Sequence, residues 1–282
     1  MIKRIISTLA LWAVLVFVVY FFKDAGFAAL MFALALMAGR EACSLLGRCG
    51  LAPSFRVYAL AALLLFLPMF CPARGVFAFS AFWFLLSVFF FAAWVLRSPY
   101  GDFLKKTVLP TFLIYALVAG MLWIYALVAA AMSDYIGVSP YSGVVLATMI
   151  IAAAKFSDVG GYLFGMAFGR HKMSPSISPK KTWEGAFGGV ALSMLVTAAI
   201  AWGFSEVLSS VMTPLQAALM ALPVAAAAIV SDLLESVLKR RADIKDSGST
   251  IPGIGGALDL ADSMLLSAPV GFAALFIIIF FF

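Results

Sequence analysis

Residues 108–132 read VLPTFLIYALVAGMLWIYALVAAAM, and none of these side chains carries a charge. A helix of about 20 apolar residues is long enough to cross the hydrocarbon core of a bilayer. Similar apolar runs lie at roughly 4–22, 25–39, 56–71, 76–96, 142–165, 186–204, 214–238 and 263–282. The sequence therefore predicts an all-α, polytopic transmembrane protein with about nine spans.

The composition supports this interpretation. Hydrophobic residues make up 65% of the 282 residues and charged residues 11%, against about 25% charged residues in an average soluble domain. A soluble globule needs a polar coat that so few charges cannot supply. Composition thus excludes an ordinary soluble protein, a disordered chain and a disulfide scaffold.

The basic residues indicate an orientation. With the N-terminus in the cytoplasm, the outer side holds only Lys23 and Arg74, while nearly all other Lys and Arg fall in cytoplasmic segments. This positive-inside pattern explains the net charge of +6 without a nucleic-acid partner. The long polar segments 166–185 and 239–262 are both cytoplasmic in this arrangement, so chemistry is expected there.

We expect one integral-membrane unit with two regions. Residues 1–140 would supply N-terminal transmembrane helices, and residues 141–282 would supply a C-terminal catalytic region with its cytoplasmic loops.

The first polar constellation lies inside the run 142–165. Lys155, Asp158 and Tyr162 share one helix face, and a charge inside a membrane helix costs at least about 2.5–3.5 kcal/mol. Two interpretations stay open: a Lys155–Asp158 pair that joins two helices, or a carboxylate that faces a polar cavity. Gly160 and Gly161 permit a close backbone approach or a local break.

The second constellation is GRHKMSPSISPKKTWEG, residues 169–185. It combines four basic residues with four hydroxyls, and Thr182 is placed to cap a helix that begins after it. Cations, hydroxyls and free N–H groups at a helix start are the donors that bind phosphate. A basic loop at the membrane surface is the alternative interpretation.

The third constellation covers residues 231–263. Asp232, Glu235 or Ser236, and Lys239 would line one face of the eighth span. Asp259 and Asp262 stand one helical turn apart at the start of the ninth, where acids are also favoured by the helix dipole alone.

Five carboxylates in these segments are candidate metal ligands: Asp158, Asp232, Asp246, Asp259 and Asp262. Because no Cys/His cluster accompanies them, the expected cation is hard, Mg²⁺ or alternatively Mn²⁺. Carboxylates, a metal and Lys/Arg together suit a displacement at phosphorus. No phosphate-binding Gly-x4-Gly-Lys-Ser/Thr loop, dinucleotide glycine pattern or serine-hydrolase elbow is present.

These motifs resemble the integral-membrane phosphatidate cytidylyltransferases, also called CDP-diacylglycerol synthases. The similar stretches are Ser-Pro-Lys-Lys-Thr-Trp-Glu-Gly at 178–185 and a C-terminal pattern. The residues in register with that pattern are Ser236, Lys239, Arg240, Lys245, Asp246, Gly248, Ile251, Pro252, Gly255, Gly256, Asp259 and Asp262. Three positions depart from it: Ile254 replaces His, Leu260 replaces Arg, and Ser231 replaces a Gly.

The resemblance implies that CTP and phosphatidic acid combine to give CDP-diacylglycerol and pyrophosphate. It implies catalytic roles for Asp232, Asp246, Asp259 and Lys239, and metal ligands among Asp232, Asp259, Asp158 and Asp262. It also implies a set of substrate-binding residues, namely Lys180, Lys181, Ser178, Thr182, Arg240, Lys245 and Ser236. The expected setting is a bacterial inner membrane with the active site facing the cytoplasm; a homodimer is left open.

Two alternatives remain at this point. One is a related enzyme that uses another lipid phosphate, such as an isoprenoid ether lipid. The other is a transporter in which Lys155, Asp158 and Asp232 line an ion path. The polar residues crowd towards one membrane face, which favours an enzyme at the interface.

Overall fold

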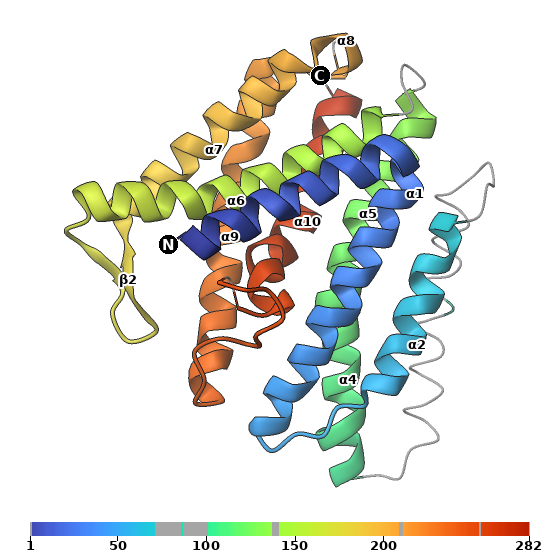
Figure 1. The fold of residues 1–282 in the computed structure, drawn as a ribbon, viewed down its shortest axis with the longest axis vertical. Helices are drawn as coiled ribbons and strands as arrows, with labels where there is room; N and C mark the ends of the chain where they lie inside the picture. The colour runs from blue at the N-terminus through green and yellow to red at the C-terminus, as the bar shows by residue number, and fades with distance from the viewer. Residues whose placement is uncertain are drawn as a thin grey trace. The chain divides into compact units, whose positions relative to one another are not determined.

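The computed structural model describes residues 2–70, 86, 101–136, 141–208, 211–253 and 255–281. Figure 1 shows the ribbon of the chain with the labels of its helices and strands. The chain forms two compact units, which are treated separately below. The first holds residues 1–131 and 241–261, and the second holds residues 132–240 and 262–282. The predicted division of the chain at residue 140 stays a prediction.

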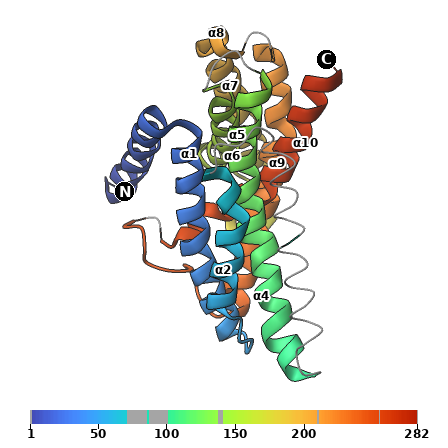
Figure 2. The ribbon, with the colours of Figure 1, turned by 90° about the vertical axis from the view of Figure 1, so that its right-hand side faces the viewer.

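The first unit begins with a long, bent helix. Helix α1 runs from Ile2 to Arg48, but Lys23 inside it has φ 51° and ψ −134°, a backbone conformation that side chains other than glycine rarely adopt. Figure 2 shows the arm before this residue turned away from the rest of α1. The bend falls between the predicted runs 4–22 and 25–39, so the break between them is confirmed, although one kinked helix carries both.

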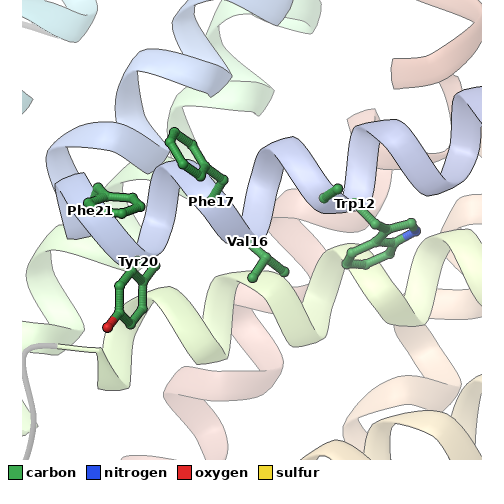
Figure 3. A pocket seen from close by; sticks show the side chains of 6 residues that line it. Trp12, Val16, Phe17, Tyr20 and Phe21 are labelled. Carbon is green, nitrogen blue, oxygen red and sulfur yellow. The ribbon is translucent and has the colours of Figure 1, made fainter.

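The arm before the bend exposes an apolar surface. Trp12, Val16, Phe17, Tyr20 and Phe21 surround a shallow, open hollow on this helix (Figure 3), and Tyr20 is 69% exposed. Positions spaced by four residues lie on one helix face. A contiguous apolar patch of this kind is unfavourable in water, so the arm suits a lipid environment.

The remaining helices of the first unit pack around aromatic side chains. Helix α2 (Phe55–Phe66) continues into a 3₁₀ turn, η1 (Leu67–Phe70). The Tyr58 hydroxyl of α2 is fully buried and donates to the Ala35 carbonyl of α1 at 2.6 Å. Thr111 accepts a hydrogen bond from the Ser54 amide at 2.8 Å, which holds the start of α2 against the next helical segment.

That next segment is helical throughout and contains the run 108–132. It consists of a π-helical turn η2 (Leu104–Val108), α4 (Leu109–Ile114), a second π-helical turn η3 (Tyr115–Gly120) and α5 (Met121–Ile136). The prediction of a helix for this run is confirmed.

The second unit contains a helix pair joined by a β-hairpin (Figure 1). Helix α6 (Ser142–Phe168) leads into the antiparallel strands β1 (Lys172–Ser174) and β2 (Ser178–Thr182), and α7 (Trp183–Gly203) follows. The hairpin is a short β-element in a fold predicted to be all-α, and backbone pairing of Lys172 with Thr182 orders the segment. The later helices are α8 (Ser205–Leu208), α9 (Pro214–Arg241) and α10 (Ala257–Phe281).

Among the described residues, six helices are long and apolar enough to cross a membrane. They are Ala10–Arg48, Leu104–Ala130, Ser142–Phe168, Trp183–Gly203, Pro214–Arg241 and Ala257–Phe281, and Phe55–Phe70 is a shorter apolar helix. The predicted run 76–96 lies outside the described residues, apart from Leu86. The chain is therefore a mainly helical, membrane-type protein.

Glycines bring α6 and α7 into backbone contact. A Cβ atom at Gly160 would lie 2.7 Å from the Gly189 Cα, and one at Gly189 would overlap the Ser157 carbonyl. Small residues allow membrane helices to approach this closely. Ser193 of α7 donates to the Ala153 carbonyl of α6 at 2.7 Å. Gly160 thus serves a close approach, and neither Gly160 nor Gly161 makes a local break, since α6 is continuous through both.

We predict that Gly160→Ala destabilises the protein by about 1–3 kcal/mol, the usual cost of overpacking. Thermal unfolding in detergent measures this change. Gly161→Ala is the matched control, because its new methyl group would meet only the Gly185 carbonyl, at 3.8 Å. Equal unfolding temperatures for the two variants would contradict the packing argument.

Candidate functional site

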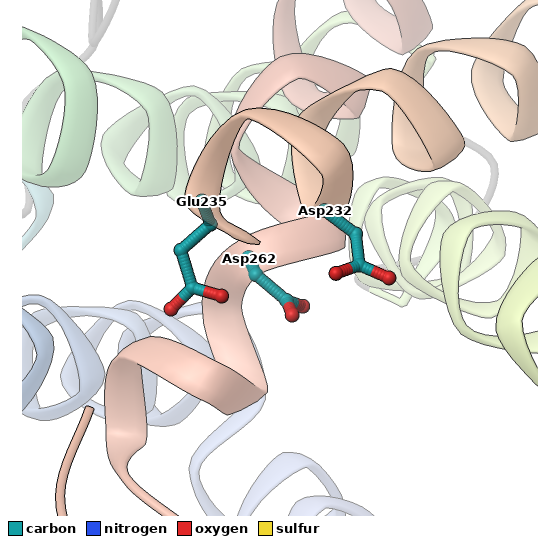
Figure 4. Close-up of side chains that lie close together, drawn as sticks. All are labelled: Asp232, Glu235 and Asp262. Carbon is teal, nitrogen blue, oxygen red and sulfur yellow. The ribbon is translucent and has the colours of Figure 1, made fainter. Parts of the chain in front are cut away.

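Three carboxylates converge in the second unit. Asp232 and Glu235 stand on one face of α9, and Asp262 stands on α10 (Figure 4). Each offers a ligand oxygen, and these oxygens all lie within 4.8 Å of one another. The side chains of Glu235 and Asp262 are buried and that of Asp232 is half-buried. Carboxylates this close repel one another strongly unless cations compensate them.

Ser231 connects the two helices that supply these acids. Its buried hydroxyl donates to the Asp262 carbonyl and accepts from the Leu266 amide, the latter at 3.3 Å. The residue that replaces the Gly of the family pattern therefore has a structural role here. It sets α9 against α10 directly beside Asp232 and Asp262.

Lysines from different elements neutralise the acids. Lys181 of β2 lies 2.5 Å from Asp232, and Lys239 of α9 lies 2.5 Å from Glu235. Lys155 of α6 is 3.7 Å from Asp262 and donates to the Ser263 hydroxyl at 2.8 Å. A carboxylate removed from water must be paired or bound to a metal, and each acid of this group has such a partner.

Asp158 belongs to the same electrostatic group. Its carboxylate interacts electrostatically with Lys155, Lys181 and Asp232, and Ser263 lies beside it. Lys155 therefore lies near Asp262 as well as Asp158. The choice between a Lys155–Asp158 pair and a carboxylate that faces a polar cavity stays a prediction.

The residues of this group could hold a metal ion. Asp232, Glu235 and Asp262 contribute only carboxylate oxygens, which are the donors that hard divalent cations prefer. The formal charges of these three carboxylates and the three nearby lysines balance. A polyanion bound beside them would add negative charge, which a bound cation could neutralise. The donor chemistry therefore fits a hard cation.

The hairpin is anchored at both of its ends. Thr182 caps α7 by accepting the Gly185 amide at 3.2 Å, so the prediction of a helix start after Thr182 is confirmed. The His171 Nδ1 atom lies 2.6 Å from the Glu184 carboxylate, which also accepts the Arg170 and His171 amides. These contacts fix the strand that carries Lys181.

Neighbouring residues of β2 face different surroundings. Lys181 is half-buried and pairs with Asp232, whereas Lys180 is exposed, because successive side chains of a strand point to opposite sides. Ser178 is half-buried. Ser236 of α9 lies at the limit of hydrogen bonding from Asp232, at 3.5 Å.

Other predicted residues lie in the first unit. Asp259 accepts the Ser247 amide at 2.9 Å and the Gly256 amide at 2.7 Å. Asp259 is the third residue of α10, and Gly256 is the residue before the helix. An acid at the third position that accepts the amide of the preceding N-cap residue forms half of a capping box. Asp259 therefore organises the start of α10. Lys245 and Asp246 are exposed.

Sequence reasoning assigned no role to Glu235 and left Ser263 out. Glu235 was noted only as one of two residues that could share a helix face with Asp232, and its i,i+4 spacing from Lys239 is the signal for the pair. Ile254 lies outside the described residues, and Leu260 is half-buried in the first turns of α10.

Comparison with known proteins identifies the family of the chain. The profile of the cytidylyltransferase family matches residues 2–278. The chain belongs to the cytidylyltransferase family. This membership extends the resemblance of the C-terminal motifs to nearly the whole chain, including the N-terminal helices.

Individual members of the cytidylyltransferase family share part of the sequence. A phosphatidate cytidylyltransferase of Pseudomonas aeruginosa is 37% identical over 134 residues, 48% of this chain and 47% of the relative. One of Haemophilus influenzae is 37% identical over 131 residues, 46% of this chain and 45% of the relative. One of Chlamydia trachomatis is 31% identical over 236 residues, 79% of this chain and 75% of the relative. The chain spans about half the length of the first two.

We predict that the purified protein binds Mn²⁺ and that Asp262→Asn weakens this binding by at least about tenfold. Loss of an outer partner of a metal ligand already costs about 10–100-fold in affinity. Titration with the metal alone, followed by electron paramagnetic resonance of free Mn²⁺, measures the change. Glu206→Gln, an exposed acid of α8, is the control; an equal affinity for both variants would contradict a site at Asp262.

Proposed function

We propose that this protein is a phosphatidate cytidylyltransferase. The observation that carries the proposal is the group of Asp232, Glu235 and Asp262 with lysines from α6, β2 and α9, in a chain of the cytidylyltransferase family. Relatives that carry the name phosphatidate cytidylyltransferase support the choice of lipid.

In the proposed reaction, a phosphate oxygen of phosphatidic acid attacks the α-phosphorus of CTP. A new O–P bond forms in line with the breaking bond between the α-phosphorus and the oxygen that bridges it to the β-phosphate. Pyrophosphate leaves with that electron pair, and CDP-diacylglycerol remains. The lipid phosphate is already an anion, so no protein nucleophile is required; the main obstacle is repulsion between two polyanions.

The lysines of the site can reduce that repulsion. Lys181 is held on an ordered strand beside Asp232, where its ammonium group can also contact a phosphate oxygen. Lys239 lies one helical turn beyond Glu235. Lys155 lies near Asp262 and donates to the Ser263 hydroxyl, and there it would hold the acids in place rather than contact CTP.

The carboxylates would bind the divalent cation that cytidylyl transfer uses. Bound there, Mg²⁺, or Mn²⁺ in its place, would neutralise charge on the CTP phosphates. Asp232 and Asp262 are the proposed ligands, joined by Glu235, and Asp158 is near enough to orient them electrostatically. Lys245 and Asp246 of the loop between α9 and α10, Arg240 near the end of α9 and Asp259 in the first turn of α10 keep their proposed catalytic and substrate-binding roles.

The proposed topology has nine spans. The two arms of α1, the shorter helix Phe55–Phe70, the run 76–96 and the five other candidate helices support this count. A cytoplasmic N-terminus then places the hairpin and the loop after α9 in the cytoplasm, where CTP is available, in a bacterial inner membrane.

We predict that purified protein with labelled CTP, phosphatidic acid and Mg²⁺ forms a CDP-lipid. Asp232→Asn and Asp262→Asn should each lower kcat/KM by about a thousandfold or more, since a lost metal ligand removes several kcal/mol of transition-state stabilisation. A panel of other lipid phosphates run in parallel identifies the preferred acceptor. Normal turnover by both variants would overturn the proposed site.

Lys181→Ala and Lys180→Ala are a matched pair for the same assay. The first removes the partner of Asp232 and the second an exposed neighbour on the same strand. Only the first should lose most of its activity. Equal losses would mean that the strand binds phosphate through its overall charge.

We predict that cysteines introduced at Lys180 and at Gln216 label from opposite sides of the membrane, in a background without Cys43, Cys49 and Cys71. Position 180 lies in the hairpin and position 216 in the first turn of α9. A membrane-impermeant maleimide added to intact cells should reach position 216 alone. Labelling of position 180 from outside would reverse the proposed orientation.

A further inference from the structure

Glu41 of α1 accepts hydrogen bonds from three points of the loop between α9 and α10. The Thr250 hydroxyl donates to it at 2.5 Å, the Ser247 hydroxyl at 3.1 Å and the Leu258 amide at 2.8 Å. All these residues belong to the first unit. More than two hundred positions separate Glu41 from the loop in sequence, so no local pattern predicts the contact.

The loop needs such a support because it has little regular structure of its own. Between the end of α9 and Ala257, the described residues contain only an isolated bridge between Ile251 and Gly255. Backbone groups outside helices and strands still require partners when they are removed from water. One carboxylate with several lone pairs can satisfy several donors at once.

Two glycines of the family pattern make room for this carboxylate. A Cβ atom at Gly248 would lie 2.5 Å from the Glu41 Oε1, and one at Gly256 would overlap the Oε2. Neither residue has a positive φ, unlike Gly253 and Gly255. Space for Glu41, rather than backbone conformation, therefore explains glycine at positions 248 and 256.

The same loop segments hold Asp259. Ser247 donates its hydroxyl to Glu41 and its amide to Asp259. At the other end, the Gly256 amide donates to Asp259 and the Leu258 amide to Glu41. Glu41 also acts as a cap for the first turn of α10, whose amides have no partner within the helix. Glu41 and Asp259 thus both accept hydrogen bonds from the two ends of this loop.

We propose that Glu41 is a positioning residue: it fixes the loop 245–258 and through it the orientation of Asp259. For catalysis the inference rests on the proposed cytidylyl transfer, while the anchoring itself is independent of that reaction. Glu41 accepts hydrogen bonds from Ser247, Thr250 and Leu258, so the proposed route of its effect on turnover is through the loop.

Hydrogen exchange of the full-length protein in detergent tests the anchoring directly. Glu41→Gln keeps the shape of the side chain but replaces an acceptor oxygen by an NH₂ group. Exchange should accelerate about 10-fold or more at the amides of Ser247, Gly256 and Leu258, and stay unchanged in α2 and α6. Glu206→Gln, an exposed acid-to-amide change outside the loop, should leave all of them unchanged. Unaltered exchange in Glu41→Gln would overturn the proposal.

A double-mutant cycle tests the path through Asp259. Glu41→Gln should lower kcat by about 10–100-fold, the range for partners that orient a functional carboxylate, and raise the Mg²⁺ concentration needed for half-maximal rate. In an Asp259→Asn background the same change should cost less than threefold, because groups that act through one another are not additive. Additive losses would overturn the positioning role.

The two kinds of failure are distinguishable. A wild-type protein that forms no CDP-lipid overturns the proposed function, whereas the exchange measurement still supports or overturns the anchoring by Glu41. Glu41→Asp provides a further check, since a carboxylate one methylene shorter should restore part of the protection at Leu258. Equal exchange in the Asp and Gln variants would count against a carboxylate-specific anchor.

Discussion

Four carboxylates and three lysines meet among otherwise apolar helices of the second unit, and they must neutralise one another. Removing a single ion from water costs several kcal/mol unless a counter-charge and hydrogen bonds compensate it. Lys155, Lys181 and Lys239 stand on α6, β2 and α9 respectively. Charge balance therefore requires the correct placement of each of these elements, and the site and the local fold depend on the same contacts.

Local signals in the sequence were sufficient for part of this arrangement. Thr182 ends an extended segment and precedes Trp183-Glu184, so the start of α7 could be placed to the residue. Helical spacing correctly put Asp232, Glu235 and Lys239 on one face. The gap between the predicted runs 4–22 and 25–39 coincides with the bend of α1 at Lys23. Each of these features depends on neighbours within one or two helical turns.

Contacts between distant segments could not be predicted in the same way. Spacing reveals which residues share a face, but not which other element that face meets. Lys181 reaches Asp232 only because the segment before α7 forms a hairpin, and Lys155 reaches Asp262 across more than a hundred residues. No role is predicted for Glu41, which lies just after the apolar run 25–39, because its partners are more than two hundred positions away in the sequence. The family pattern contains glycine at 248 and 256. The structure gives the reason, because a side chain at either position would overlap the Glu41 carboxylate.

The glycine contact between α6 and α7 has a mechanical consequence for the lysines. Where two backbones touch, the separation of the helices cannot adjust by changes of side-chain rotamer, as it can across a seam of leucines. Lys155 stands on α6, and Lys181 stands on the hairpin that joins α6 to α7. The backbones that carry these two ammonium groups are consequently held at a set separation, and under the proposed function the adjustment of the site to a bound polyanion would involve α9 and α10.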